Sequence, residues 1–324
     1  MTTTTAVVLG GPRHREQHSA GRHVRNDDLV PVHGLPGGLL LLLRIVESRD
    51  GCALIVEVAP DKGARAVIGP FALALRVALD ALPPAVGLER DGDRIARVVY
   101  TQNGRTETIE CRGVLSTLPL PQLVQMTTPA LPPAVAEHAA KLRYRSLKLI
   151  YIALTRPQLT DYHWVYLLDS QYRVNRMSEQ KNVSGEMVPS DRTILCIELS
   201  CWCDEPVWRA SDDEVYRIAL ADLMKMGYGV TEAEVEDYYV VDIATAYPVY
   251  ELSFEDHLIP VLEGVHAVPN LQTLGRHGLF LNNSMDDNVL LGMKVADQIA
   301  AGGFDSRAWL SEMLAFMNLR FQGK

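Results

Sequence analysis

Residues 270–301 combine a short strand, glycines and an amphipathic helix in close succession, and read NLQTLGRHGLFLNNSMDDNVLLGMKVADQIAA. Apolar residues recur at helical spacing from Val289 to Ile299, and Asn283 or Ser284 stands where a helix cap is expected. A strand, a glycine turn and a helix N-terminus together offer a site for an electron-rich group of a ligand. The alternative interpretation is an ordinary polar connection with a capped helix.

The first predicted strand, residues 5–11, runs into Gly10 and Gly11. A dinucleotide-binding βαβ unit begins in this way. The glycine fingerprint then fails, because Pro12 and Arg15 occupy the places of its second and third glycines. The sequence therefore predicts an incomplete nucleotide-binding start.

A second buried strand is predicted at residues 52–57 and ends in Glu57, with Gly63-Ala64-Arg65 shortly after it. A carboxylate at the tip of a second parallel strand is placed to accept hydrogen bonds from an adenosine ribose. The alternative is a surface glutamate at a strand end. The glycine and arginine at this offset favour the ribose.

The rest of the chain alternates between strand and helix patterns. Further strands are predicted at residues 86–90, 95–102, 106–111, 113–117, 147–154, 164–168, 193–199 and 239–243, and helices at 71–82, 133–141 and 215–226. Ser211 and Glu214 have the spacing of a capping box. Residues 172–182 are densely polar, which indicates a solvated loop or a substrate contact. Two tyrosines in 246–250 either line a pocket or belong to the core.

The composition excludes several classes of partner. The net charge of −9 disfavours nucleic acid and anionic membrane surfaces. No apolar run approaches the length of a membrane span, and residues 1–11 lack the basic segment of a signal peptide. Five cysteines without a paired framework favour a reducing cytoplasm. No metal site is predicted, because neither His14/His18 nor Cys201-Trp202-Cys203 has further ligands at zinc-site spacing.

Several motifs occur in the order expected of one known family. They are VLSTLPLP at 114–121, LRYRSLKLIYIAL at 142–154, AYPVY at 246–250 and GRHGLFLNNSMDDNVLLGMKVAD at 275–297. With the strand-Gly-Gly start and Glu57, this set resembles FAD-dependent oxidoreductases of the flavin amine oxidase and protoporphyrinogen oxidase type. It is also similar to the related UDP-galactopyranose mutases. The resemblance runs from Ile95 to Ala301 and is fragmentary before that.

The resemblance implies a mixed α/β fold (α+β) with two parts. A Rossmann-like FAD-binding domain, incomplete at its N-terminal side, is expected over residues 1–126, with 12–51 irregular. A substrate domain of a sheet plus helices is expected at 127–260. Residues 261–324 would return to the FAD-binding domain.

The resemblance also implies FAD as the cofactor. By position, the cofactor would contact Gly10, Gly11, Glu57, Gly63, Ala64, Arg65, Thr117, Pro119, Gly275, Arg276, Met285 and Asp286. The helix beginning near Asp287 would point at the flavin and stabilise the negative charge of its reduced form. Candidates for substrate contact are Asn175, Arg176, Lys181, Tyr247 and Tyr250.

The function implied is oxidation of a C–N or C–C bond of a small molecule by hydride transfer to flavin N5. No residue is predicted to be catalytic, because the flavin accepts the hydride. One alternative is a sugar-nucleotide mutase that uses reduced flavin. A second alternative is an inactive remnant, because the glycine loop is disrupted and the family's long insertion after Arg65 is missing. A natural rearrangement and a shifted reading frame over residues 12–51 would both produce such a stretch.

Overall fold

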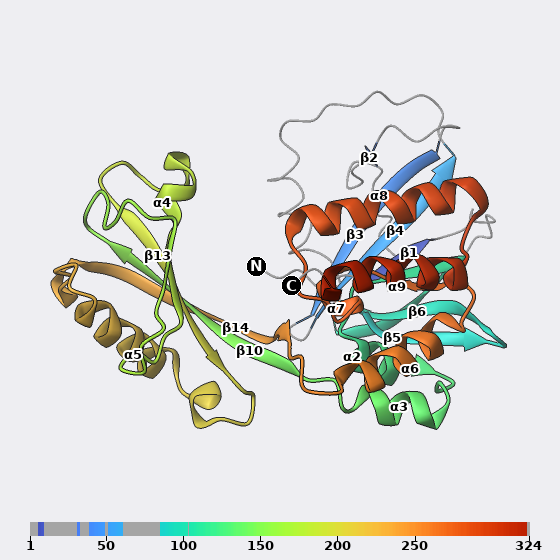
Figure 1. Ribbon diagram of the computed structural model, residues 1–324. Coiled ribbons are helices and arrows are strands. Elements are labelled where there is room, and N and C mark those ends of the chain that lie inside the picture. The colour runs from blue at the N-terminus through green and yellow to red at the C-terminus, as the bar shows by residue number, and fades with distance from the viewer. Residues whose placement is uncertain are drawn as a thin grey trace. The chain divides into compact units, whose positions relative to one another are not determined.

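The computed structural model describes residues 6–9, 31–32, 39–48, 51–60, 85–102 and 104–322 (Figure 1). The chain divides into two compact units. The first comprises residues 1–143 and 248–324, and the second comprises residues 144–247. The second unit lies within the range 127–260 expected for a substrate domain and is narrower than that range. The domain boundaries stay a prediction.

A three-stranded sheet of order β1-β8-β15 lies at the centre of the first unit. Its strands are β1 (Ala6–Leu9), β8 (Gly113–Ser116) and β15 (Leu271–Thr273). β15 runs parallel to β8, and both strands therefore end at the same edge. Every residue of β8 is buried, as expected for a central strand.

The direction of β1 corrects the expectation of a βαβ start. β1 pairs with β8 in the antiparallel direction, with Leu9 opposite Gly113. The strand thus ends at the edge where β8 begins, away from the edge where β8 and β15 end. Gly10 and Gly11 lie outside the described residues, and their contact with the cofactor stays a prediction.

Glu57 likewise does not end a parallel strand. β4 (Gly51–Pro60) pairs antiparallel with β3 (Leu39–Ser48), and β2 (Pro31–Val32) joins the other side of β3. Glu57 stands opposite Leu42 inside this hairpin. The prediction of a second parallel strand is therefore wrong, because β4 follows β3 directly and pairs with it in the antiparallel direction.

A four-stranded sheet of order β7-β6-β5-β9 completes the sheets of the first unit. It contains β5 (Ala85–Asp91), β6 (Arg94–Gln102), β7 (Arg105–Glu110) and β9 (Thr127–Thr128). The predicted hairpin of residues 86–111 is confirmed, and Gly92 turns its first bend with φ +61°. After β8 the prolines do more than stop the strand, because Pro119 caps α2 (Leu120–Met126).

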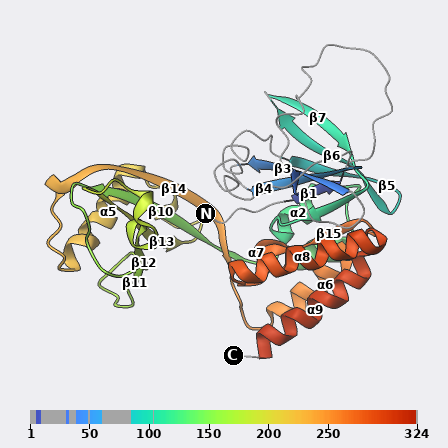
Figure 2. The ribbon, with the colours of Figure 1, turned by 90° about the horizontal axis from the view of Figure 1, so that it is seen from above.

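Helices pack on one side of β15 in this unit, as Figure 2 shows for α6, α8 and α9. The helices are α3 (Pro133–Ala139), α6 (Phe254–His266), α7 (Gly275–Gly278), α8 (Met285–Gly302) and α9 (Ser306–Gln322). The indole of the buried Trp309 on α9 donates a hydrogen bond to the Thr273 carbonyl at 2.8 Å. This contact fastens α9 to the end of β15.

The second unit is a five-stranded sheet of order β11-β12-β13-β10-β14 with a helix on one face. The strands are β10 (Tyr144–Leu154), β11 (Trp164–Tyr166), β12 (Arg176–Glu179), β13 (Thr193–Cys201) and β14 (Val235–Pro248). The helices are α4 (Gln180–Val183), α5 (Asp212–Lys225) and the short η2 (Gly185–Met187), η3 (Pro206–Arg209) and η4 (Glu232–Glu234). The predicted capping box of Ser211 and Glu214 is confirmed at the start of α5.

α5 covers the face of this sheet that carries alternate apolar residues of its central strands. Ile150 and Ile152 of β10 and Ile197 of β13 pack there with Ala219 and Leu223 of α5. The alternation of buried side chains explains why the two long strands were recognisable in the sequence. Residues 176–183, by contrast, were read as part of a polar loop. Arg176–Glu179 form β12, because their backbone pairs with β13 and β11, and Gln180–Val183 form α4.

No helix in the described part of the chain is long and apolar enough to cross a membrane. The described residues also contain no group of three or more His, Cys, Asp or Glu side chains placed to hold a metal ion.

Candidate functional site

The parallel strands β8 and β15 bring Thr117 and Gly275 together at their carboxyl ends. Gly275 has φ +79°, a conformation that residues with a side chain rarely adopt. A Cβ at this position would lie 3.3 Å from Thr117 Cγ2. At Gly278 a Cβ would lie 2.7 Å from the Ser116 carbonyl oxygen. Glycine is therefore needed at both positions for α7 to sit directly on the end of β8.

The hydroxyl oxygen of Thr117 is buried, yet it makes no hydrogen bond within the described residues. Buried hydroxyl groups nearly always have a partner in native proteins. Ligands of open α/β sheets bind outside the carboxyl ends of parallel strands, which is where this oxygen lies. Thr117 thus offers a polar contact to a ligand at this edge.

The loop after α7 ends in the N-terminus of α8, and side chains hold its shape. Arg276 Nη2 donates to the Asn283 carbonyl oxygen at 2.8 Å. The Ser284 hydroxyl and backbone N–H both bond to the Asp287 carboxylate, at 2.8 and 3.0 Å. These contacts confirm Ser284 as the cap of α8. They fix a helix N-terminus, which carries a partial positive charge, at the end of the glycine loop.

Tyr250 supports the same loop from α6's side of the unit. Its hydroxyl oxygen accepts a hydrogen bond from the Asn282 N–H at 2.6 Å. Its ring lies against Phe254 and Phe280, with centroids 4.7 and 6.0 Å away. Burial raises the pKa of Tyr250 above its ordinary value. Tyr250 therefore positions the segment that leads into α8, a role that its sequence neighbourhood did not reveal.

Apart from Glu57, which lies in the hairpin of β3 and β4, the predicted cofactor residues divide into three groups. Thr117, Gly275 and Arg276 come together at the sheet edge, and Met285 and Asp286 form the first, exposed turn of α8. Pro119 is buried at the start of α2. The third group, residues 63–65 with Gly10 and Gly11, lies outside the described residues.

Among the substrate candidates, Arg176 lies in the interior of the second unit's sheet. Its Nε donates to Glu198 Oε1 at 2.9 Å, and its Nη1 lies 3.4 Å from the Tyr166 hydroxyl. Burial alone would lower the pKa of Arg176, but the hydrogen bonds to Glu198 and Tyr166 raise it above its ordinary value. The guanidinium is therefore a permanent cation whose charge Glu198 balances.

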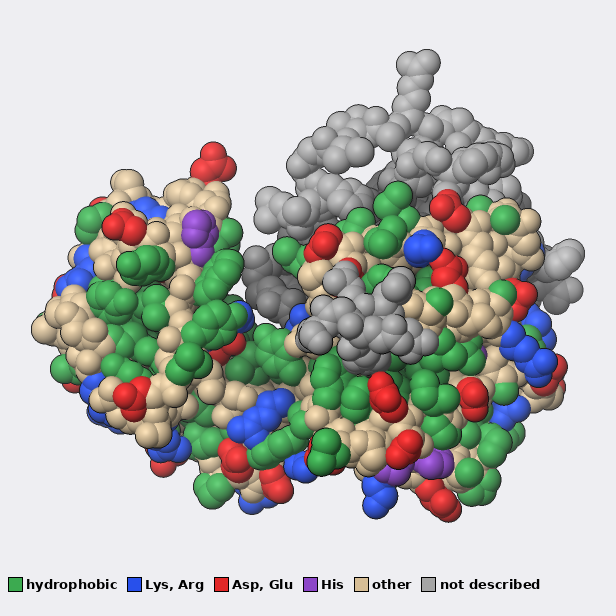
Figure 3. Space-filling view, in the orientation of Figure 1, with side chains coloured by type: hydrophobic (Ala, Val, Ile, Leu, Met, Phe, Trp, Pro, Cys, Tyr) green, Lys and Arg blue, Asp and Glu red, His purple; other side chains and the backbone are tan. Residues whose placement is uncertain are grey.

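Arg176 belongs to the sheet face opposite α5. Tyr247 of β14 packs on this face against Leu147, Leu149 and Cys196. Aromatic rings continue across it, since Tyr151 stacks on Tyr239 with centroids 4.6 Å apart. Figure 3 shows hydrophobic side chains at the surface of this unit. The face carries apolar and aromatic side chains and the ion pair of Arg176 with Glu198.

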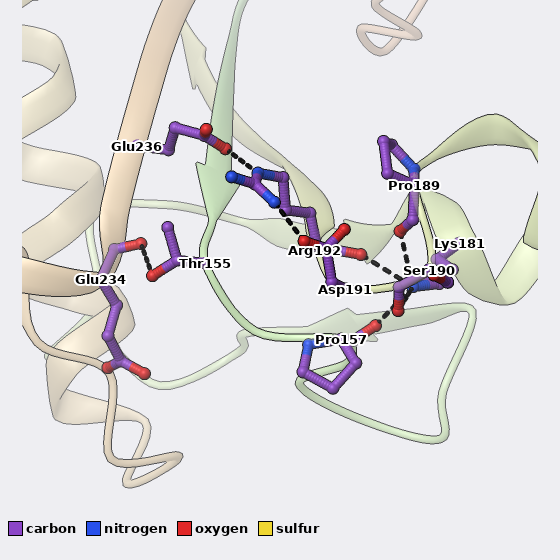
Figure 4. Close-up of polar contacts among 9 residues, drawn as sticks. All are labelled: Thr155, Pro157, Lys181, Pro189, Ser190, Asp191, Arg192, Glu234 and Glu236. Carbon is purple, nitrogen blue, oxygen red and sulfur yellow. Dashed lines mark hydrogen bonds and ion pairs between the residues drawn. The ribbon is translucent and has the colours of Figure 1, made fainter.

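Lys181 and Asn175 have structural roles that the sequence did not indicate. Lys181 Nζ lies 2.8 to 2.9 Å from the carbonyl oxygens of Pro157, Pro189, Ser190 and Arg192 (Figure 4). An ammonium group has three N–H donors, and these acceptors occupy them. Lys181 thus closes two loops rather than offering its charge to a substrate. Asn175 Oδ1 accepts the Ser200 N–H at 2.6 Å and fixes the strand edge.

Comparison with known proteins identifies the family of this chain. The sequence profile of flavin containing amine oxidoreductases matches residues 84–300. The chain therefore belongs to the flavin-containing amine oxidoreductase family, as the motifs indicated. A search of curated proteins finds no match to the chain.

Solved structures support the same fold. Reduced UDP-galactopyranose mutase matches with a TM-score of 0.56 and 17% identity, over 67% of this chain and 46% of that chain. A candidate protoporphyrinogen oxidase from Exiguobacterium sp. 255-15 matches with a TM-score of 0.52 and 19% identity, over 71% and 50%. A putrescine oxidase variant matches with a TM-score of 0.50 and 15% identity, over 71% and 52%. The chain thus spans about half the length of the structures it matches.

Proposed function

We propose that this chain binds FAD at the shared edge of β8 and β15 and acts as an oxidoreductase on a small molecule. The observation that carries the proposal is the pairing of Gly275 with Thr117. A glycine in the left-handed conformation lets α7 begin directly beside Thr117, and the buried hydroxyl of Thr117 has no described partner. A flavin of the family's kind would accept this hydrogen bond at the strand ends.

The described residues have distinct tasks in this proposal. Thr117 Oγ1 would hydrogen-bond the cofactor, and Gly275 and Gly278 would let it approach the backbone. Arg276 and Ser284 would keep the N-terminus of α8 in place, where its dipole stabilises negative charge. Bound FAD would supply a hydride acceptor for oxidation of a C–N or C–C bond.

The substrate side is proposed to be the aromatic face of the second unit. Tyr247 and the stacked rings of Tyr151 and Tyr239 would contact an apolar or aromatic part of the substrate. Arg176 would hold the Tyr166 hydroxyl in place by its hydrogen bond. It would not bind a substrate as a free cation, because Glu198 already balances its charge.

The mutase alternative would use arginines to clamp a sugar-nucleotide diphosphate, for which Arg143, Arg145, Arg173 and Arg176 are the candidates. Three of the four side chains are engaged within the protein. Arg143 pairs with Glu251 at 2.9 Å, and Arg176 pairs with Glu198. Arg145 bonds to Ser200 and lies 3.8 Å from Glu205. Anaerobic reduction by candidate amines, set against turnover of UDP-galactopyranose with dithionite, separates an oxidoreductase from a mutase. An inactive remnant would give neither reaction.

The absorbance spectrum of purified protein tests flavin binding directly, and one pair of glycine variants tests its location. Gly275→Ala and Gly227→Ala both place alanine at a left-handed position, with φ +79° and +81°. The backbone strain of about 1–2 kcal/mol is matched between them. Nothing lies within 4 Å of a Cβ at Gly227. Gly275→Ala should lower flavin content severalfold, whereas Gly227→Ala should not. Equal flavin content in the two variants would refute the proposed site.

A further inference from the structure

A separate cavity of about 160 Å³ lies in the first unit, where the end of α3, the start of α6 and the loop after α7 meet. Its lining includes Lys141 and Arg143 from the segment after α3, Ser253 and Phe254 at the start of α6, and Phe280. All of these residues belong to one compact unit. The proposed flavin contacts Thr117 and Gly275 do not line it.

The lining carries excess positive charge in an acidic chain. Arg143 is balanced by Glu251 at 2.9 Å, and both line the cavity. Lys141 also lines it and forms no ion pair within the described residues. The start of α6 adds the partial positive charge of a 13-residue helix, which Glu255 and Asp256 in its first turn partly offset.

Two residues of the lining adopt a backbone conformation that side chains disfavour. Ser253 has φ +69° and Phe280 has φ +51°. They are the positive-φ residues other than glycine among the described residues. Ser253 stands at the cap position of α6, yet its hydroxyl forms no cap hydrogen bond. Strained residues cluster at ligand sites, and here both face one cavity.

The remaining lining determines what kind of anion fits. Val249 and Phe254 are half-buried and leave apolar surface in the lining, whereas Leu142 and Phe280 are already buried. A bare inorganic ion would leave this apolar surface against water. An anion with a short hydrocarbon body would cover it.

We propose that this cavity binds a small organic anion, with a carboxylate or phosphate head at Lys141 and the start of α6 and a short apolar body against Val249 and Phe254. The site is independent of the flavin proposal. Both head groups are acceptors of charge-assisted hydrogen bonds from an ammonium group.

The test is calorimetric titration of the full chain with butyrate, butyl phosphate, butanol and inorganic phosphate. Saturable binding of butyrate or butyl phosphate is expected, and the tighter of the two identifies the head group. Butanol and inorganic phosphate should bind at least about tenfold more weakly, because each lacks one half of the ligand. Either of them binding as tightly as the organic anions would overturn the proposal, as would the absence of saturable binding by both anions.

Three variants locate the binding. Lys141→Gln should weaken binding of the organic anion about tenfold through loss of one charge-assisted hydrogen bond. Ala140→Met should fill part of the cavity without changing charge and also weaken binding. Arg307→Gln removes one positive charge from an exposed site on α9 and should leave affinity unchanged. Unchanged affinity in both cavity variants would refute the location. Flavin absorbance of each sample is recorded separately, because anion binding without bound flavin would still support this site.

Discussion

Asn270 and Ile95 lie 175 residues apart in sequence and exchange two hydrogen bonds. The Ile95 N–H donates to Asn270 Oδ1 at 2.9 Å, and Asn270 Nδ2 donates to the Ile95 carbonyl at 2.8 Å. The same amide nitrogen also donates to the Arg112 carbonyl at 2.9 Å. One buried side chain therefore joins β6 to the residues that precede β8 and β15, the strands that form the candidate site.

Asn270→Ala should destabilise the first unit by about 2–4 kcal/mol, because it leaves the Ile95 N–H without its partner and removes one hydrogen bond from each of the Ile95 and Arg112 carbonyl groups. Urea unfolding followed by circular dichroism measures the change. Gln125→Ala, on an exposed position of α2, is the matched control and should change stability by less than about 0.5 kcal/mol. A similar unfolding midpoint in both variants would contradict the role given to Asn270.

His266 makes the stability of the first unit depend on pH. Burial lowers the pKa of His266 from its ordinary value to about 4, opposed by its hydrogen bond to the Leu262 carbonyl. Its Nε2 lies 3.3 Å from the Thr273 N–H, which needs a neutral ring as acceptor. The unfolded chain binds a proton near pH 6.5, and the folded chain does so only near pH 4. Stability from this group is therefore present above pH 6.5 and is lost as pH falls toward 4.

The loss should be on the order of 3 kcal/mol between these pH values, read from urea midpoints across that range. His266→Gln should be less stable at neutral pH but should lack this part of the pH dependence. His163→Gln, at an exposed position of the second unit, should retain the wild-type slope. Parallel pH profiles for wild type and His266→Gln would show that the buried ring does not control the transition.

Local signals predicted the elements of this fold well. The capping box of Ser211 and Glu214 depends on residues three apart, and it forms; Ser284, one of the two expected caps of α8, stands at the cap position. The strand at β15 and the glycine at its end were likewise visible in the sequence. These features are decided by neighbouring residues, so the sequence alone can reveal them.

Pairing between distant segments was not predictable in the same way. The run that forms β1 is equally compatible with parallel and antiparallel pairing, and its direction depends on contacts with β8. Glu57 looked like the end of a strand, yet its partner Leu42 lies in a hairpin. Lys181 looked available for a substrate, because no local pattern reveals that its long side chain reaches carbonyl groups of two separate loops. Thr117 and Gly275 meet only because β8 and β15 are parallel.

Glu179 holds the second unit together in a comparable way. Its buried carboxylate accepts hydrogen bonds from the N–H groups of Leu159 and Thr160 and from the hydroxyls of Thr160 and Thr193. Glu179→Gln replaces one acceptor oxygen with a donor and should destabilise this unit by about 2–4 kcal/mol. The unfolding transition of the full chain measures it. Glu186→Gln, an exposed acid nearby, should have no effect, and equal effects of the two substitutions would contradict this account.

Tyr250→Phe tests whether the loop before α8 must be held for the cofactor to bind. The substitution keeps the ring contacts with Phe254 and Phe280 but removes the oxygen that accepts the Asn282 N–H at 2.6 Å. The lost hydrogen bond should cost about 1 kcal/mol of stability. Because the segment after Asn282 leads directly into the N-terminus of α8, flavin affinity should fall severalfold, measured by fluorescence titration with FAD.

Tyr162→Phe removes a hydroxyl from an exposed ring in the second unit and is the control, which should change neither stability nor flavin affinity. A loss of stability in Tyr250→Phe with unchanged flavin affinity would separate the two roles. It would mean that Tyr250 holds the fold while the N-terminus of α8 keeps its place through Arg276 and Ser284, whose contacts with Asn283 and Asp287 the substitution leaves intact. If stability and flavin affinity both fell in Tyr250→Phe, flavin binding at the ends of β8 and β15 would depend on Tyr250, which lies outside the glycine loop.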